Sequence, residues 1–257
     1  MKTFYLTGTG NSLQIARGVG SGGELVSIPR FLREHRGGAE RIVVEDDVIG
    51  LVFPTYWCAL PQIVVEFLQR TRLEADYLFA IATRGNATAT LKSHLLQVAR
   101  QNGHVISYYS HQNMPDNYLP LFDMAKEKLR YDEDALTKSM AAMAADIGAR
   151  KHNTGGIAGL TFLRPFLTRF ADMKMADFSQ RFIVSESCDG CETCARVCSA
   201  QIIKLSNNNP VFHGVCNGCL ACAHNCPNTA ILMRKEKSTE RYRNPTVTLS
   251  DLIAANS

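Results

Sequence analysis

The sequence predicts an α/β protein in which a doubly wound, five-stranded parallel sheet precedes a small α+β domain. Three observations support this class. Short apolar runs alternate with helical segments as far as Tyr109, the pattern of repeated strand–helix units. Polar loops follow the first, third and fourth of these runs. Eight of the nine cysteines lie between positions 188 and 226, which marks a separate metal-binding segment.

Composition sets the outer limits. The chain has 257 residues, 46% of them hydrophobic and 20% charged, which is ordinary for a globular protein with one large or two modest domains. A net charge of +4 is too small to indicate nucleic-acid binding. No apolar run approaches the ~18 residues of a membrane span. The start, MKTFYLTGTGNSL, lacks the features of a signal peptide. We therefore expect a cytoplasmic protein of a low-oxygen organism, without a transmembrane segment.

The first strand is expected at residues 2–6 and runs directly into the loop TGTGNS and a helix. Glycines permit an unusual backbone path, and the free N–H groups of the helix start attract phosphate. Two known phosphate-binding motifs do not match this loop. The lysine of G-x-x-x-x-G-K-[ST] is absent, and Leu13 stands in place of the third glycine of G-x-G-x-x-G. A simple polar turn is the alternative. The candidate phosphate-binding residues are Thr7, Thr9, Gly10, Asn11 and Ser12.

The later elements continue the alternation of strands and helices. Strands are expected at 24–28, 48–53, 77–83 and 104–109, helices at 62–70, 88–101 and 132–150, and a polar connector at 30–46. Ligands of such sheets bind beyond the carboxyl ends of the strands. The candidate residues there are Pro54, Thr55, Tyr56 and Trp57 after the third strand, and Thr83, Arg84, Gly85 and Asn86 after the fourth. A pair of aromatic residues capping the core is the alternative for Tyr56 and Trp57.

The cysteines form two quartets of the pattern C-x₂-C-x₂-C-x₃-C. Three closely spaced thiolates can hold three irons of a cubane, and the fourth reaches the other cluster. The predicted ligands are Cys188, Cys191, Cys194 and Cys226 for one 4Fe–4S cluster, and Cys216, Cys219, Cys222 and Cys198 for the other. Gly190 and Gly218 would let the backbone approach the sulfur atoms. Structural zinc is the alternative metal, whereas disulfides are disfavoured.

Both ends of the chain resemble known families. The loop T-x-T-G-N-S is similar to the phosphate loop of flavodoxin-like proteins, and the cysteine segment resembles bacterial two-cluster ferredoxins, except that Ser199 stands where proline is usual. This order of domains resembles the bacterial and archaeal EFR1-type proteins. The resemblance implies FMN rather than FAD and the strand order 2-1-3-4-5. It also implies that Tyr56 or Trp57 stacks on the flavin ring and that Thr83–Asn86 contact its edge.

The predicted domains are a flavodoxin-like domain at 1–150, a linker with an interdomain helix at 151–180, a ferredoxin domain at 181–235 and a charged, solvated tail at 236–257. In the ferredoxin domain we expect 181–184 to pair with 230–233, and 202–205 to form a hairpin with 211–212. The loop at 110–122 leaves the edge of the sheet that carries the flavin loops. It is expected either to shape the flavin site or the domain contact, or to be a plain surface loop.

These features together favour an electron-transfer protein in which two 4Fe–4S clusters exchange electrons with FMN. Its partner would be a redox protein or another low-potential donor. The alternative is an FMN-dependent reductase of a small-molecule acceptor, for which Tyr118, His111 and Asp116 are candidate proton donors. A zinc-stabilised flavodoxin acting as a sensor is a third possibility. His213 and His224 are not expected to bind metal, because eight thiolates satisfy two cubanes.

Overall fold

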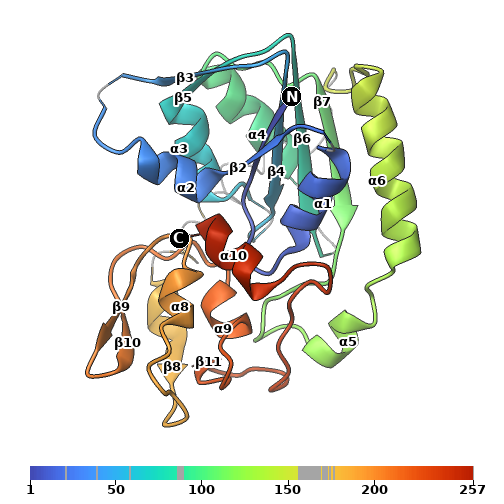
Figure 1. The fold of residues 1–257 in the computed structure, drawn as a ribbon. Coiled ribbons are helices and arrows are strands. Elements are labelled where there is room, and N and C mark those ends of the chain that lie inside the picture. Colours follow the sequence, from blue (N-terminus) through green and yellow to red (C-terminus); the bar gives the residue numbers. More distant parts are fainter. Residues whose placement is uncertain are drawn as a thin grey trace.

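The computed structural model describes residues 1–20, 22–38, 40–57, 59–85, 90–155, 169, 173, 175 and 177–256. A five-stranded parallel sheet with the order β2-β1-β4-β6-β7 forms the centre of its first part (Figure 1). The strands of this sheet are β1 Lys2–Tyr5, β2 Glu24–Ser27, β4 Val48–Pro54, β6 Tyr77–Arg84 and β7 Tyr108–Asn113. Counted along the chain, this is the predicted order 2-1-3-4-5, which is confirmed and is consistent with a flavodoxin-like fold.

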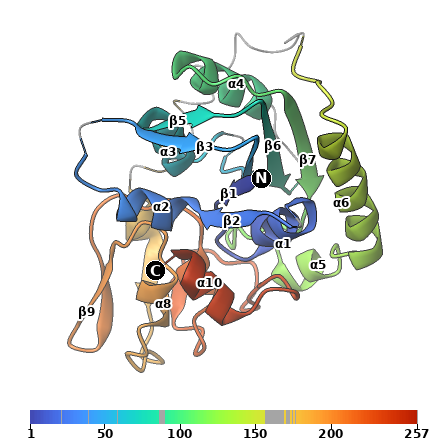
Figure 2. The same ribbon diagram turned by 45° about the horizontal axis from the view of Figure 1, so that its top comes forward.

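Helices cover both faces of the sheet (Figures 1 and 2). One face packs on α2 Ile28–Glu34, α3 Gln62–Arg70 and α4 Leu91–Gln101, and the other on α1 Asn11–Val19 and α6 Glu133–Gly148. Adjacent strand residues point to opposite faces. Leu51 and Phe53 therefore enter the first core, and Val52 enters the second. Burial on both faces explains why β4 is a continuous apolar run in the sequence.

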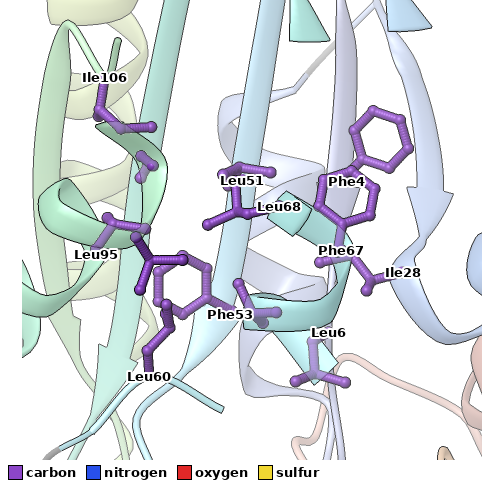
Figure 3. Close-up of a cluster of buried hydrophobic side chains, with 14 of the residues drawn as sticks. Phe4, Leu6, Ile28, Leu51, Phe53, Leu60, Phe67, Leu68, Leu95 and Ile106 are labelled. Carbon is purple, nitrogen blue, oxygen red and sulfur yellow. The ribbon is translucent and has the colours of Figure 1, made fainter. Parts of the chain in front are cut away.

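The first core is built around aromatic and aliphatic side chains that the helices bring to the sheet (Figure 3). In α3, the buried residues Ile63, Val64, Phe67 and Leu68 recur at helical spacing and so form one apolar stripe. The Phe67 ring lies 4.7 Å from the ring of Phe4 on β1, measured between centroids. This packing fixes α3 against the sheet and, with it, the end of the loop that follows β4.

Two expectations for the first part were wrong. The connector at 30–46 contains most of α2 and the strand β3 Ile42–Glu45, which pairs in parallel with β5 Thr71–Glu74 away from the main sheet. The fifth strand begins at Tyr108 rather than at residue 104 and continues to Asn113. Val105 is exposed. Regular pairing of β7 with β6 begins only at the pair Tyr108 and Phe79. The apolar run at 104–109 therefore predicted the start of the strand too early in the sequence.

The second part consists of short elements around the cysteines. These are η2 Phe178–Arg181, β8 Phe182–Val184, α8 Thr193–Arg196, β9 Ile203–Ser206, β10 Asn209–Phe212, α9 Ala221–His224 and β11 Ile231–Met233. The predicted pairing of the terminal strands and the predicted hairpin are both present, as the antiparallel pairs β8–β11 and β9–β10. Most of the predicted linker helix at 151–180 lies outside the described residues, as does Cys58. Within the described residues, no helix combines the length and apolarity needed to cross a bilayer.

The C-terminal segment is packed rather than solvated, which corrects the prediction for residues 236–257. Tyr242, Asn244 and Val247 are buried, and α10 Leu249–Asn256 contacts α2. In Figure 1, α10 lies between the sheet and the short helices α8 and α9. The charged residues of the segment concealed these buried positions, because the side chains between them point to solvent. The helix α5 Met124–Lys128 completes this side of the molecule.

Leu252 provides a test of this packing. Its side chain is fully buried against the second core, so Leu252→Ala should lower the free energy of unfolding by about 2–5 kcal/mol. The neighbouring Ser250 is exposed, and Ser250→Ala should change it by less than about 0.5 kcal/mol. Urea unfolding followed by circular dichroism measures both. Equal midpoints for the two variants would contradict a packed α10.

Candidate functional site

Four loops from the carboxyl edge of the sheet meet around one cavity, which we call the loop cavity. It brings together most of the residues predicted after β1, β4 and β6 and adds part of the loop after β7. Its lining is Thr7, Gly8, Thr9, Asn11, Ser12, Pro54, Thr55, Tyr56, Thr83, Arg84, Gly85, Met114, Pro115, Asp116 and Asn117. Asn86 lies outside the described residues, and Gly10 and Trp57 are not part of this lining.

The loop after β1 has the local structure of an anion cradle. Gly10 adopts a φ of +101°, which favours glycine, and immediately precedes α1. Its N–H donates to Thr7 Oγ1 at 3.0 Å, and the hydroxyls of Ser12 and Thr83 lie 2.8 Å apart. The loop therefore offers hydroxyls, amides and a helix start, and none of its residues is cationic. This donor set fits a phosphate monoester held by neutral groups.

A second cavity of about 240 Å³ adjoins the first and is mainly apolar; we call it the ring cavity. Its lining is Thr55, Tyr56, Trp57, Gly85, Asp116, Asn117, Tyr118, Leu121, Phe122, Gly218 and Leu220. The rings of Trp57 and Tyr118 meet edge to face, with centroids 4.9 Å apart. A flat aromatic ligand fits such a lining. The two cavities share Thr55, Tyr56, Gly85, Asp116 and Asn117, so the flavin of the prediction has room for both its phosphate and its ring.

Two residues of the ring cavity, Gly218 and Leu220, come from the cysteine segment and flank Cys219. The backbone of Cys219 also touches the phosphate loop, because a Cβ placed on Gly8 would lie only 2.6 Å from the Cys219 carbonyl oxygen. The Asn117 side-chain amide bridges the two loops. It donates to the Cys219 carbonyl at 3.2 Å and to Thr9 Oγ1 at 3.4 Å. The cysteine segment is therefore part of the wall of the site.

His224 connects Asn117 with Tyr242 of the C-terminal segment through hydrogen bonds at both of its ring nitrogens. Its Nδ1 accepts the N–H of Tyr242 at 3.1 Å, so Nε2 carries the hydrogen and donates to the Asn117 carbonyl at 2.7 Å. Burial lowers the pKa of His224 to about 4. The ring is neutral at ordinary pH, and both of its nitrogens are engaged in hydrogen bonds.

Asp116 is a carboxylate in a mainly apolar wall. It lines both cavities, and its Oδ1 accepts the N–H groups of Asn117 and Tyr118 at 2.8 and 3.0 Å. Burial raises the pKa of the Asp116 carboxyl above its usual range, and the nearby Glu127 adds to this effect. Of the candidate proton donors, Asp116 and Tyr118 face the ring cavity. His111 does not, and its Nε2 lies 2.7 Å from a guanidinium nitrogen of Arg84.

The two sets of cysteines remain predicted ligand sets, and the structure shows how their members are buried. The first set lines a common cavity: Cys188, Cys191, Cys194 and Cys226. Burial raises the pKa of Cys194 to about 11, and the other three thiols of this set contribute to the rise. In the second set, burial raises the pKa of Cys216 to about 12, with contributions from Cys219 and Cys198. Cys222 is fully buried beside the same three residues. A cation bound among such thiols would favour their ionised form.

Backbone groups near the cysteines are also arranged for sulfur. The N–H of Gly218 donates to Cys216 Sγ at 3.3 Å, and that of Ala230 donates to Cys226 Sγ at 3.2 Å. Gly190 and Gly218 have φ values of +75° and +68°, which favour glycine. Ser199 is buried, with its hydroxyl 3.8 Å from Cys219 Sγ.

The described residues contain no group of three or more His, Cys, Asp or Glu side chains that converges to hold one metal ion. In a cubane each thiolate binds a different iron, so the four sulfurs surround the cluster instead of converging. All eight cysteines of the two sets are free thiols.

Several residues of the site were not predicted from the sequence. Asn117 lies in a loop whose role was left open, Leu220 was hidden between two cysteines, and Tyr242 and Asn244 belong to the supposed tail. The Tyr242 hydroxyl donates to Asn11 Oδ1 at 2.7 Å, and the Asn244 amide donates to Gln14 Oε1 at 2.7 Å. No local pattern in the sequence indicates that the C-terminal segment lies next to the phosphate loop.

Comparisons with known proteins add little. No protein-family model matches the chain, and no curated protein does. One similar solved structure is that of a Bacteroides uniformis protein proposed to be a flavoprotein. It shares 13% identity with this chain, and the match covers 55% of this chain and 96% of the other at a TM-score of 0.34. The superposition is loose, so the functional argument depends on the site itself.

Asp116 gives a pH-dependent prediction. Because the folded state raises its pKa, the folded protein binds a proton more readily than the unfolded chain. Stability should therefore fall as the pH rises from about 4 through the folded pKa. Asp116→Asn keeps an oxygen for both N–H groups and removes the buried charge. This variant should be more stable than the parent at pH 7 and should show no such gain at pH 4.

Chemical denaturation at the two pH values measures this effect. The control is Asp123→Asn, at the N-cap of α5 in the same loop region and outside both cavities. It should shift stability equally at both pH values. If Asp116→Asn changed the free energy of unfolding equally at both pH values, the pKa of the Asp116 carboxyl would not be raised in the folded protein.

Proposed function

We propose that this protein is an internal electron relay that carries FMN in the joined loop and ring cavities and a 4Fe–4S cluster on each set of cysteines. The observation that carries this proposal is the position of Cys219. Its two neighbours form part of the ring cavity, and its carbonyl contacts Gly8 of the phosphate loop. A cluster held by the second set would adjoin a flavin held by the first domain.

The cofactors would supply the redox chemistry, since a flavin exchanges two electrons and each cluster only one. The burial of the cysteines indicates the order in which the two clusters and the flavin would lie. Cys191 is exposed and Cys188 half-buried, whereas Cys219 and Cys222 are buried. Cys194 and Cys222 lie close enough for their charges to interact. The first set is thus the end that an external donor can reach, and the second set leads to the flavin cavity.

Proton movement at the flavin would depend on few groups. The titratable residues of the two cavities are Tyr56, Arg84, Asp116 and Tyr118. Arginine stays charged and burial raises the pKa of Tyr56 well above its usual value, whereas the raised pKa of Asp116 makes its carboxyl a better proton donor than an exposed carboxylate. The apolar wall of Leu220 and Phe122 would limit water at the ring.

A second candidate is an FMN-dependent reductase of a small-molecule acceptor. It is favoured by Leu121, which lines the ring cavity and is 60% exposed, so that this side can admit a ligand from solvent. One acceptor reduced far faster than all others would support the reductase, and unselective reduction would support the carrier. In either case we propose a cytoplasmic protein that takes electrons from a low-potential donor, such as another redox protein.

Cofactor content tests the proposal directly. Anaerobically purified protein should contain about eight irons, about eight sulfides and one FMN per chain. Stepwise reduction should bleach both the broad cluster absorbance and the structured flavin bands. Two zinc ions without sulfide would contradict the clusters, and iron without flavin would contradict the flavin site.

Trp57 tests the ring cavity separately. Removal of an aromatic contact costs roughly 0.5–1.5 kcal/mol, so Trp57→Leu should weaken FMN binding by up to about tenfold. Phe212→Leu is the matched control, because Phe212 stacks on Phe182 and lines neither flavin cavity. Fluorescence titration of the flavin-free protein gives both dissociation constants. An unchanged constant for Trp57→Leu would place the ring elsewhere.

A further inference from the structure

Tyr56 lies between the proposed flavin and the second set of cysteines. It follows β4 and lines the loop and ring cavities, and it also lines a further cavity that contains Cys216. A tight turn fixes its backbone, since the N–H of Tyr56 donates to the Ala59 carbonyl at 3.2 Å and that of Ala59 to the Tyr56 carbonyl at 2.9 Å. The ring packs against both cores of the first domain. Its position is therefore well defined.

The Tyr56 hydroxyl is buried and has no hydrogen-bond partner among the described residues. Leaving such a group unsatisfied costs about 1–3 kcal/mol, so native proteins almost always pair it. Burial raises the pKa of Tyr56 well above its usual value, and the adjacent charges of Cys219 and Cys216 raise it further. A neutral, unpaired O–H group whose side chain lines the same cavity as Cys216 is a donor that lacks only its acceptor.

We infer that the Tyr56 hydroxyl donates a hydrogen bond to a sulfur of the cluster held by Cys216, Cys219, Cys222 and Cys198, and thereby raises the reduction potential of that cluster. This inference depends on the proposed function. Hydrogen bonds to sulfur stabilise the more negative, reduced cluster and are one of the determinants of its potential. Tyr56 differs from the other donors at this set, Gly218 and Ser199, because it belongs to the flavin loop. It would link the potential of the cluster to the structure of the flavin site.

The experiment compares Tyr56→Phe with the parent protein, both carrying their clusters and flavin. Loss of the donor should shift one of the two clusters to a more negative potential and leave the other unchanged. We expect about a tenfold change in the one-electron equilibrium of that cluster, which is ~59 mV. Redox titration followed by electron paramagnetic resonance resolves the clusters, and absorbance follows the flavin.

Tyr109→Phe is the matched control. The Tyr109 hydroxyl is also buried and without a hydrogen-bond partner among the described residues, and burial raises its pKa to about 12. The nearby charge that lowers this pKa is that of Arg84, and Tyr109 lines neither of the cavities that contain cysteines of the two sets. Tyr109→Phe should leave both cluster potentials unchanged. A shift of similar size in both variants would mean a general effect of losing a buried hydroxyl and would overturn the inference.

Two further outcomes are decisive. If Tyr56→Phe shifts the flavin potential alone, the hydroxyl bonds to the flavin and the inference is wrong. If neither potential moves, it is also wrong, although the relay itself stands as long as iron, sulfide and FMN are present in the parent. Absence of clusters from the parent would instead refute the proposed function.

Discussion

The close approach of Gly8 to the Cys219 carbonyl is the contact on which the rest of the site depends. Any side chain at position 8 would collide with the backbone of the cysteine segment. The contact brings one loop of each domain together, and the Asn117 amide then spans both. The wall of the ring cavity is complete only because these loops touch. A glycine of the predicted phosphate loop thus also permits the contact with the cysteine segment.

The C-terminal segment makes this contact compatible with an anion site. The backbone N–H of Asn244 donates to the Thr9 carbonyl at 2.8 Å, and the Asn256 side-chain amide donates to the Thr7 carbonyl at 3.3 Å. Carbonyl oxygens repel a phosphate, whereas N–H groups attract it. The C-terminal segment donates hydrogen bonds to two carbonyl oxygens of the phosphate loop from the outer side. The N–H and O–H donors of the loop can then serve the cavity. A tail of charged composition therefore has a structural role at the other end of the chain.

The parts that sequence could predict are those whose signals are local. The apolar run of β4 predicts a strand buried on both faces, and the spacing of the cysteines predicts two sets, the first of which lines one cavity. Asn117 and Leu220 could not be assigned, because their roles arise from contacts between segments about a hundred residues apart; Asn117 and Cys219 are separated by 102 positions. Tyr242 was missed for a related reason, since its burial depends on His224 and Asn11 rather than on its neighbours in sequence.

Burial differs between the two sets of cysteines, and this difference constrains any relay. The second set of cysteines, here called the inner set, is the more buried. Addition of an electron to a desolvated, anionic cluster is unfavourable in an environment without water. Without compensation, an inner cluster would be harder to reduce than the outer one, and electrons would not move toward the flavin. Two polar groups lie at the inner set, the Gly218 N–H and the Ser199 hydroxyl, and the inferred hydrogen bond of Tyr56 would add a third. Polar groups placed there can offset the desolvation, so the direction of electron flow would follow from hydrogen bonds at the domain contact.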